Sequence, residues 1–363
     1  MDHSGKNTAI CPIATTFPSL SFLKTVVLFG GTGFIGTHLT AFLLETFPNI
    51  NLVVGDLRPF GSGRYFPSVV QKSLLSGRIQ YIPLDVRKSL LKASLPDSAD
   101  MIVNLAAICR EPGHEHHEYF ETNLKGAENV CEWAEYIDCR NILFTSSIAV
   151  YGFVENDTDE GTLPLPRTAY GSSKLAAELL HRCWQGSGPG RQLLIIRPGV
   201  VYGAGENANV TRLIRAVLKR HFVFTGNQAT RKAGGYVKEL CRVLMWLFER
   251  QCREKSGFLL ANFGMSPLPS VSAYVDAILR TAHRPGQWIP SVPFSLVRGL
   301  SIPISMISRM AGGKSGIDPL RVDKIARSTP IIPGVLLESG YTFRYSLDEA
   351  LSDWFRECPA DWL

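Results

Sequence analysis

The sequence contains no C-x-x-C pair, although it has eight cysteines in 363 residues. Thiolate zinc sites and dithiol redox motifs usually need such close pairs, so neither class of site is predicted. Several cysteines lie in apolar or helical stretches such as NVCEWAEY and LLHRCWQ. We therefore expect reduced cysteines in the core of a cytoplasmic protein.

Long apolar runs and basic runs are also missing. No apolar stretch approaches the ~20 residues that a helix needs to cross a membrane, so no membrane span is predicted. The first 22 residues are polar and mixed, without the apolar centre of a signal peptide, and we expect residues 1–22 to form an N-terminal extension outside the fold. The formal net charge of +6 is mild, which favours a local positive surface for an anionic substrate over nucleic acid as a partner.

The apolar run at 25–29 (TVVLF) is followed at once by GGTGFIG and THLTAFLLE, the order of a strand, a glycine-rich turn and a helix. Two glycine patterns overlap there, because Gly31, Gly33 and Gly36 spell G-x-G-x-x-G and Gly30, Gly33 and Gly36 spell G-x-x-G-x-x-G. Either pattern removes side chains in front of the helix N-terminus, where free backbone N–H groups stabilise a pyrophosphate. A dinucleotide-binding turn is therefore predicted here.

Asp56 ends the next expected strand, NLVVGD, twenty residues after Gly36. A carboxylate at this point accepts hydrogen bonds from the ribose hydroxyls of NAD and repels the 2′-phosphate of NADP. Arg58 lies two residues later and would soften that repulsion. A loop aspartate that caps the following turn is the alternative interpretation. The spacing favours NAD as the cofactor.

Alternating strands and helices continue to about residue 205. The strand in RIQYIPLD delivers Asp85 toward the adenine side, and ADMIVNLAAI ends in small residues that let a dinucleotide lie against the sheet. Single-helix connections predict a doubly wound parallel α/β sheet of the Rossmann type over residues 23–205. Residues 206–363, with a strand expected at 258–264, are predicted to form mainly a smaller C-terminal substrate-binding lobe over the carboxyl edge of the sheet.

His114, His116 and His117 lie together with Glu115 and Glu118 in one segment. Such a group suggests a metal site, but no second group of ligands occurs elsewhere in the sequence. No metal is therefore predicted, and a solvated or substrate-facing loop is the preferred interpretation.

Tyr170 and Lys174 lie four residues apart in AYGSSKLAAE, so they share one face of an expected helix. A free tyrosine titrates near ~10 and is a poor base at neutral pH. A neighbouring ammonium and an oxidised nicotinamide would stabilise the phenolate and lower its pKa. Ser147 follows the apolar strand in NILFTSS and would join the site from the sheet edge. Because Y-x-x-x-K is common, an ordinary helix is the alternative interpretation.

Together, GGTGFIG, Asp56, NLAA, Asn123, SSIAVYG, YGSSK and RPGVVYG resemble the extended short-chain dehydrogenase/reductase family. Within it, the chain is most similar to NAD-dependent sugar-nucleotide epimerases and dehydratases, such as the UDP-glucose/UDP-galactose 4-epimerases. The resemblance runs from about residue 24 to residue 355. It implies NAD as the cofactor and a nucleotide-diphosphate sugar as the substrate, as used in polysaccharide biosynthesis.

The resemblance also implies a role for individual residues. The catalytic residues would be Ser147, Tyr170 and Lys174. Cofactor contacts would come from Gly30, Gly33, Phe34, Ile35, Gly36, Asp56, Arg58, Asp85, Val86, Leu105, Ala106, Ala107, Asn123, Tyr170, Lys174 and Pro198. Substrate contacts would come from Arg110, Ser147, Asn209, Arg231, Lys232 and Arg327.

A homodimer is also implied, through helices expected at 123–136 and 170–184. The apolar residues that would form this contact, or else simply the core, are Val130, Trp133, Leu175, Leu179 and Leu180.

Departures from the family pattern bear on the substrate and on the reaction. Val200 stands where many UDP-sugar epimerases have an asparagine that touches the substrate phosphate, and TRKAGGYV replaces the usual arginine–aspartate stretch. The dehydratases carry an acidic pair directly after the active-site hydroxyl residue, whereas Ile148, Ala149 and Val150 follow Ser147 here. Elimination is therefore disfavoured.

The expected function is NAD-dependent epimerisation of a nucleotide sugar at C4, through a transient 4-keto intermediate and with Tyr170 as the base. Two alternatives stay open: an NAD(P)H-dependent 4-keto sugar-nucleotide reductase, and a non-catalytic dinucleotide-binding sensor or scaffold. A tuned phenol argues against the sensor. Hydroxysteroid dehydrogenases share the glycine turn and Y-x-x-x-K, but the missing membrane segment disfavours them.

Overall fold

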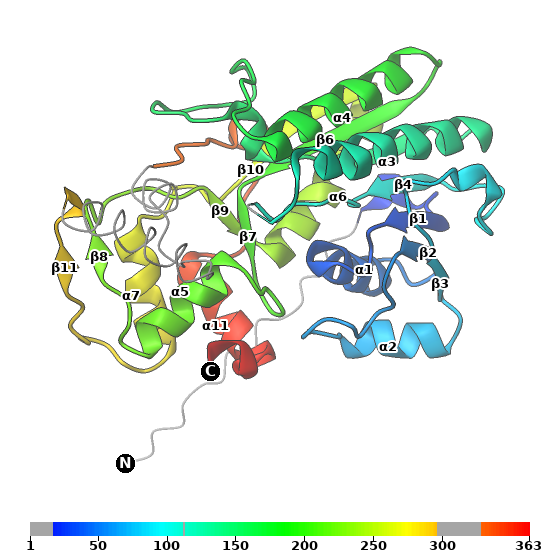
Figure 1. Ribbon diagram of the computed structural model, residues 1–363. Helices are drawn as coiled ribbons and strands as arrows, with labels where there is room; N and C mark the ends of the chain where they lie inside the picture. The colour runs from blue at the N-terminus through cyan, green and yellow to red at the C-terminus, as the bar shows by residue number, and fades with distance from the viewer. Residues whose placement is uncertain (1–16, 112, 296–327) are drawn as a thin grey trace.

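A seven-stranded parallel sheet forms the centre of the protein (Figure 1). The structure is a computed structural model that describes residues 17–111, 113–295 and 328–363. The strands follow the order β10-β6-β5-β4-β1-β2-β3 across the sheet. They are β1 (Thr25–Phe29), β2 (Asn51–Asp56), β3 (Ile79–Pro83), β4 (Met101–Asn104), β5 (Asn141–Thr145), β6 (Gln192–Pro198) and β10 (Phe258–Phe263). The predicted doubly wound Rossmann sheet is confirmed.

Helices cover both faces of the sheet because strand side chains alternate between the two faces. Val26 and Leu28 of β1 point to the face covered by α1, α2 and α6, whereas Val27 and Phe29 point to the face covered by α3 and α4. These helices are α1 (Phe34–Thr46), α2 (Ser68–Leu75), α3 (His116–Tyr136), α4 (Ala169–Gly186) and α6 (Val237–Glu254). Short 3-10 helices occur at η1 (Pro18–Leu20), η2 (Leu90–Lys92) and η3 (Ile148–Tyr151). No helix in the described ranges is long and apolar enough to cross a membrane.

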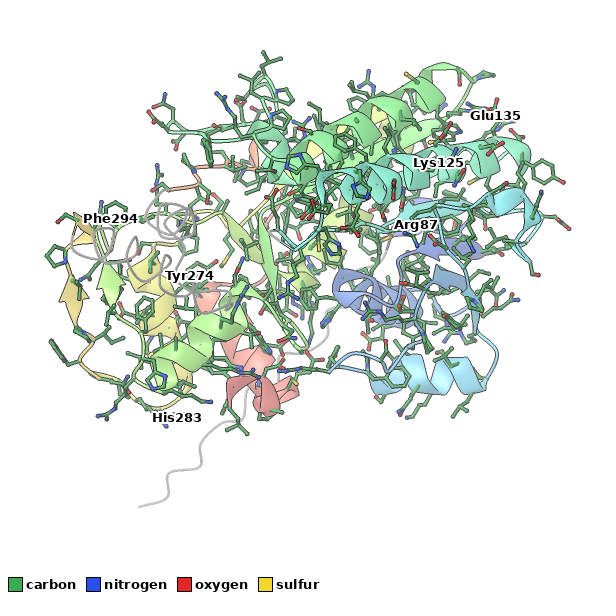
Figure 2. The ribbon with its side chains drawn as sticks, in the orientation of Figure 1. Arg87, Lys125, Glu135, Tyr274, His283 and Phe294 are labelled. Carbon is green, nitrogen blue, oxygen red and sulfur yellow. The ribbon has the colours of Figure 1, made fainter. Side chains whose placement is uncertain are left out.

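A smaller lobe lies beside the sheet, on the left of Figure 1. Its centre is aromatic: the ring of Tyr202 packs against Tyr236, Tyr274 and the fully buried Trp354. Figure 2 labels Tyr274, His283 and Phe294 in this lobe. Its elements are β7 (Val200–Tyr202), α5 (Asn209–Leu218), β8 (Phe224–Thr225), β9 (Gly234–Tyr236), α7 (Val271–Thr281), β11 (Ser291–Val292), α11 (Leu347–Glu357) and η4 (Pro359–Trp362).

The predicted division near residue 205 is wrong for α6 and β10, which belong to the sheet domain. β10 pairs in parallel with β6, from Phe258 opposite Leu193 to Phe263 opposite Pro198. A further helix, α10 (Gly334–Glu338), packs on β10. The sequence pattern predicts the strand itself correctly. It gives no sign of the partner, because pairing between distant strands is a tertiary property.

The predicted N-terminal extension is wrong over residues 17–22, because Phe17 and Leu20 of this segment join the core. Phe17 stacks on Phe47 with ring centroids 6.1 Å apart. Leu20 in η1 is completely buried in the core cluster that includes α6. An isolated apolar residue in a polar stretch has no periodic signal, so its burial depends on the helices that meet it. Residues 1–16 of the predicted extension lie outside the described residues.

α3 and α4 lie side by side along the top of the molecule in Figure 1. Val130 and Trp133, both expected as dimer contacts or core, are buried in the core of their own chain. Leu175 and Leu180 are partly buried against it. Leu179, by contrast, is 60% exposed. The outward face of this helix pair is therefore narrower than the sequence predicts.

Leu20→Ala is expected to destabilise the protein by about 2–5 kcal/mol, because it leaves a cavity at a completely buried position. The measurement is the shift of the urea unfolding midpoint. The matched control is Leu75→Ala, at a leucine that is 90% exposed, where the change should stay within about 0.5 kcal/mol. Equal effects of the two substitutions would contradict the assignment of residues 17–22 to the core.

Candidate active site at the carboxyl ends of the strands

The glycine-rich turn joins β1 to α1 at the carboxyl edge of the sheet. Gly30 has a φ of +77°, and a Cβ there would lie 2.6 Å from the backbone nitrogen of Ala106. A Cβ on Gly36 would lie 2.5 Å from the Cα of Gly31. On Gly33 an added Cβ would meet only the Gly30 carbonyl oxygen, at 3.3 Å. Gly30 and Gly36 are thus required by close packing, whereas Gly33 borders more open space.

This turn fits the diphosphate of a dinucleotide. No side chain caps the N-terminus of α1, whose first turn begins with Phe34 and Ile35. The first turn of a helix leaves backbone N–H groups without intrahelical acceptors. Those donors, together with the positive end of the helix dipole, stabilise a phosphate that can approach across glycine.

Asp56 lies at the end of β2, beside the glycine-rich turn. Its carboxylate oxygens accept hydrogen bonds from the backbone N–H groups of Thr32 at 3.1 Å and Leu57 at 2.7 Å. A carboxylate has about four acceptor positions, so two remain for ribose hydroxyls. Arg58 is exposed and forms no ion pair with another described residue. Asp56 therefore has free acceptor positions for the predicted ribose contact, with the exposed cation of Arg58 two residues away.

The segment after β4 approaches the turn through its main chain. The Leu105 N–H donates to the Phe29 carbonyl at 2.9 Å, and Ala106 contacts the Gly30 position described above. Ala107 follows directly and is half-buried like both of them. Leu105, Ala106 and Ala107 thus lie next to the glycine-rich turn, and their contact with a dinucleotide stays a prediction.

Asn123 is predicted to contact the cofactor, but both of its amide donors are already used. They bond the Ile108 carbonyl at 3.1 Å and the Ser173 hydroxyl at 2.9 Å. Its side-chain oxygen accepts from the Ile108 N–H at 2.8 Å. The geometry favours a bracing role, in which Asn123 fastens the segment after β4 to α4.

Asp85 and Val86 follow β3, as predicted, but neither side chain is free. Arg87 donates to both oxygens of Asp85, at 2.6–3.0 Å, and its hydrogen bonds hold the pKa of that carboxyl below its usual value. Val86 is buried against Gly126 of α3. Pro198, another predicted cofactor contact, is buried at the end of β6. A ligand would therefore contact these three residues mainly through their main-chain atoms.

Ser147, Tyr170 and Lys174 come together at the end of β5. Ser147 caps η3, where its hydroxyl accepts from the Ala149 N–H at 3.2 Å. Tyr170 lies in the first turn of α4, where the Ser147 side chain is close enough to favour its phenolate. Lys174 is buried one turn later, with its Nζ 4.3 Å from the centre of the Phe144 ring.

Burial is the main influence on both ionisable groups. It raises the pKa of Tyr170 well above the ordinary value, and the Ser147 side chain offsets only part of this rise. Burial also lowers the pKa of Lys174 to about 8, although the charge of Glu178 acts in the opposite direction. A phenolate at Tyr170 therefore needs positive charge nearby, from the Lys174 ammonium and an oxidised nicotinamide.

The sequence motifs do not predict a buried ion pair that lies beneath these residues. Arg197 of β6 donates to both carboxylate oxygens of Glu178, which follows Lys174 by one helical turn, at 2.9 and 2.6 Å. Both members are at most 5% exposed. The available signal is the arginine inside the apolar run LLIIRP, because a buried charge requires a partner.

Arg231 and Lys232, predicted substrate ligands, lie beside the segment that begins at Ser328. The Thr329 N–H donates to the Arg231 carbonyl at 2.9 Å. The Arg231 guanidinium pairs with Asp157 at 3.0 Å on the surface. Burial lowers the pKa of Lys232 to about 8. The pair therefore connects the segment before α4 with the C-terminal part of the chain.

The other predicted substrate ligands are less constrained. Arg110 is exposed after β4, and its carbonyl accepts from the Tyr119 hydroxyl at 2.7 Å. Asn209 is exposed at the start of α5, and its side-chain oxygen accepts from Arg212 at 3.0 Å. Arg327 lies outside the described residues. The structure does not bring Arg110 and Asn209 into contact with Tyr170.

The segment with three histidines begins α3. Glu115 and Glu118 form a reciprocal capping box there, and His114 lies 3.4 Å from the Glu118 carboxylate. Across the described ranges, no group of three or more His, Cys, Asp or Glu side chains is arranged to hold a metal. The acidic residues that suggested a metal site thus serve to start a helix.

The sequence model of the NAD dependent epimerase/dehydratase family matches residues 26–258. The chain belongs to this family. NAD is the cofactor of the family, as the glycine-rich turn and Asp56 predict. The resemblance inferred from the motifs is confirmed.

Individual relatives differ in what they act on. The chain is 27% identical over 329 residues to the N-acetyl-alpha-D-glucosaminyl-diphospho-ditrans,octacis-undecaprenol 4-epimerase of Escherichia coli O157:H7, covering 90% of this chain and 92% of that protein. It is 24% identical over 335 residues to the 3beta-hydroxysteroid-dehydrogenase/decarboxylase isoform 1 of Arabidopsis thaliana, covering 81% and 76%. The solved UDP-glucuronic acid 4-epimerase from Bacillus cereus with NAD superposes with a TM-score of 0.71 at 19% identity, over 93% and 100% of the two chains. That likeness shows the fold.

For this member of the NAD dependent epimerase/dehydratase family, we expect NAD to bind roughly 10- to 100-fold more tightly than NADP. Two like charges ~4 Å apart at an effective dielectric of ~20 repel by about 4 kcal/mol, and Arg58 offsets part of this cost at Asp56. Asp56→Ala should narrow the preference, whereas Asp97→Ala at an exposed loop residue should leave it unchanged. Calorimetry with both cofactors is the measurement. Equal or tighter NADP binding by the wild type would mean that Arg58 dominates.

Proposed function

We propose that this protein is an NAD-dependent epimerase that inverts C4 of a nucleotide-diphosphate sugar. The observation that supports this most is the placement of Ser147, Tyr170 and Lys174 at the carboxyl edge of the sheet, the edge that also carries the glycine-rich turn. A hydroxyl donor, a phenol base and a buried ammonium are the groups needed to interconvert an alcohol and a ketone.

Each of the three residues has a separate role in the proposed reaction. The Ser147 hydroxyl orients the reacting sugar oxygen, and the Tyr170 phenolate removes its proton as the C4 hydrogen leaves. Bound NAD supplies hydride acceptance and return at that carbon. Lys174 holds the nicotinamide ribose and keeps positive charge beside the phenol. After the 4-keto sugar has turned over, Tyr170 returns the proton and the opposite configuration results.

Elimination is disfavoured because no acid follows Ser147, where Ile148, Ala149 and Val150 lie instead. The same-class alternative is a 4-keto sugar-nucleotide reductase, which uses the same three residues but consumes reduced cofactor. A non-catalytic sensor is the other alternative. The Ser147 side chain, which favours the Tyr170 phenolate, argues against it, since binding alone does not need a tuned phenol.

A second candidate substrate is a sugar joined through diphosphate to a polyprenol. It is favoured by the E. coli relative, whose name states such a substrate and which aligns over 92% of its length. Val200, in place of the asparagine expected for UDP-sugars, is compatible with it. Phe153, Leu163 and Leu165, between Ser147 and Tyr170 in the chain, are 57–72% exposed and offer an apolar surface.

Either substrate belongs to polysaccharide biosynthesis, and we propose the cytoplasm as the location. Free thiols support that location: all seven cysteines within the described residues are unpaired, as is usual in a reducing compartment.

The test supplies UDP-hexoses and a polyprenyl-diphosphate N-acetylhexosamine to the purified protein and measures conversion at C4 by NMR. Epimerisation without added cofactor, with NAD retained on the protein, supports the epimerase. A protein that requires NADPH and accepts only a 4-keto sugar is a reductase, and one that turns over neither class contradicts the proposal.

Tyr170→Phe should lower turnover by about 10²–10⁴-fold, because it removes the proton-transfer group. NAD affinity measured by calorimetry should change little. The matched control is Tyr136→Phe, at a tyrosine that is 71% exposed, and it should retain full activity. Wild-type turnover in the Tyr170→Phe protein would remove Tyr170 from the mechanism.

We also propose a homodimer through the outward face of α4. Leu179 is 60% exposed there, Cys183 is exposed and Ala176 is partly exposed, which leaves an apolar strip on the helix. The neighbouring surface of α3 is charged, with Lys125 paired to Glu128 at 2.7 Å. Figure 2 marks α3 by Lys125 and Glu135. A partner would therefore contact mainly α4.

Leu179→Glu is expected to convert a dimer to a monomer, because a carboxylate would be buried at the centre of the contact without a partner. Light scattering at micromolar concentration gives the mass. Leu75→Glu, on the exposed side of α2, is the control and should leave the mass unchanged. A wild type with the mass of one chain would refute the dimer.

A further inference from the structure

The buried carboxylate of Glu178 joins α4 to the ends of β5 and β6 beneath the catalytic residues. It projects from α4, one turn after Lys174. One of its oxygens accepts a hydrogen bond from the hydroxyl of Ser146, the residue before Ser147. Both oxygens accept from Arg197 on β6. The backbone N–H of Ser146 also donates to Ile196 of β6, at 2.7 Å. Glu178 thus joins the end of β5, α4 and β6 directly beneath the site.

The charges under Tyr170 are confined to a few groups. Lys174 and Arg197 are cations and Glu178 is an anion, and all three side chains are buried. His181, one turn further along α4, is neutral: its Nδ1 donates to the Ala177 carbonyl at 2.7 Å, and burial lowers its pKa to about 4. One net positive charge therefore remains beneath the phenol.

The groups that face Lys174 come from several elements. Glu178 and His181 lie on its own helix, and Phe144 of β5 stacks on the His181 ring at 4.2 Å between centroids. Cys109, after β4, acts on both Lys174 and Tyr170. Arg197 lies behind Glu178. Of these groups, Glu178 is the anion that raises the pKa of Lys174 most, in opposition to burial.

We propose that Glu178 is a positioning residue for the reaction, which keeps Lys174 in its ammonium form and fixes the strand end that carries Ser147. Arg197 is its partner and limits how strongly the carboxylate acts on Lys174. The inference deepens the proposed function and rests on it for its catalytic meaning, but the charge of Lys174 can be measured independently of any substrate.

Removal of either partner changes the balance of the buried charges. Without Glu178, the cations of Lys174 and Arg197 would lie in a buried site with no anion, and the lysine is the one that can release a proton. Without Arg197, the whole carboxylate charge would act on Lys174. The two substitutions should therefore shift the ionisation of Lys174 in opposite directions. A purely structural role of Glu178 does not predict opposite shifts in the ionisation of Lys174.

The experiment follows the ¹³Cε resonance of lysine by NMR in the full chain with NAD bound, with Lys174 assigned by its loss in Lys174→Arg. Glu178→Gln should lower the pKa of Lys174 by about one unit or more, and Arg197→Met should raise it. The double variant removes both charges and should lie between the two. Glu254→Gln, which breaks a surface pair with Arg250 on α6, is the matched control and should cause no shift.

Two results would overturn the proposal. One is an equal pKa of Lys174 in all of these proteins, and the other is a shift of that pKa in the same direction in Glu178→Gln and Arg197→Met. If Glu178→Gln does not fold, the difference between Arg197→Met and the double variant decides the question. The high-pH limb of kcat/KM should move with Lys174, to lower pH in Glu178→Gln. A wild type without epimerase activity would refute the proposed function, while the NMR titration would still judge the role of Glu178.

Discussion

A parallel sheet brings the carboxyl ends of all its strands to one edge, and the candidate site depends on that constraint. The glycine-rich turn after β1, Asp56 at the end of β2 and Ser147 after β5 come from distant parts of the chain. They share an edge because each strand runs in the same direction. α4 then covers the face behind that edge and contributes Tyr170 and Lys174. One topological rule therefore assembles both a cofactor turn and a catalytic cluster.

The proposed reaction at this edge requires charged forms of Tyr170 and Lys174 in a place where the fold excludes water. Burial alone opposes the mechanism, since it raises the pKa of Tyr170 and lowers that of Lys174. The Ser147 side chain and the Glu178 carboxylate act in the opposite direction, and Glu178 is itself held by Arg197. A buried ion pair is weak support for stability, because its desolvation cost is of the same size as its attraction. Its position under the site suits a functional role better.

Local patterns predict where most of the candidate residues lie, and long-range contacts account for what the patterns miss. Asp56 at the end of β2 and Tyr170 near the start of α4 are placed correctly from the sequence, because strand, turn and helix signals lie within a few residues of each. The place of β10 in the sheet and the burial of Leu20 are missed because each depends on a partner far along the chain. The pairing of Arg197 with Glu178 spans two elements and is missed for the same reason. The spacing of residues within one helix or strand predicts how their side chains are arranged. Contacts between distant elements, in contrast, are seen only in the structure.

Hydrogen bonds connect the ion pair to the C-terminal part of the chain. Arg197 donates to the Tyr151 hydroxyl at 2.9 Å, which donates to the side-chain oxygen of Asn262 at 2.8 Å. Asn262, in β10, in turn donates to the Ile332 carbonyl at 3.0 Å. A continuous row of hydrogen bonds thus runs from beneath Lys174 to the segment before α10. That segment is joined to Thr158, on the loop before α4, by a parallel bridge through Ile331. The return of β10 to the sheet therefore also connects the loop before α4 with the ion pair beneath Lys174.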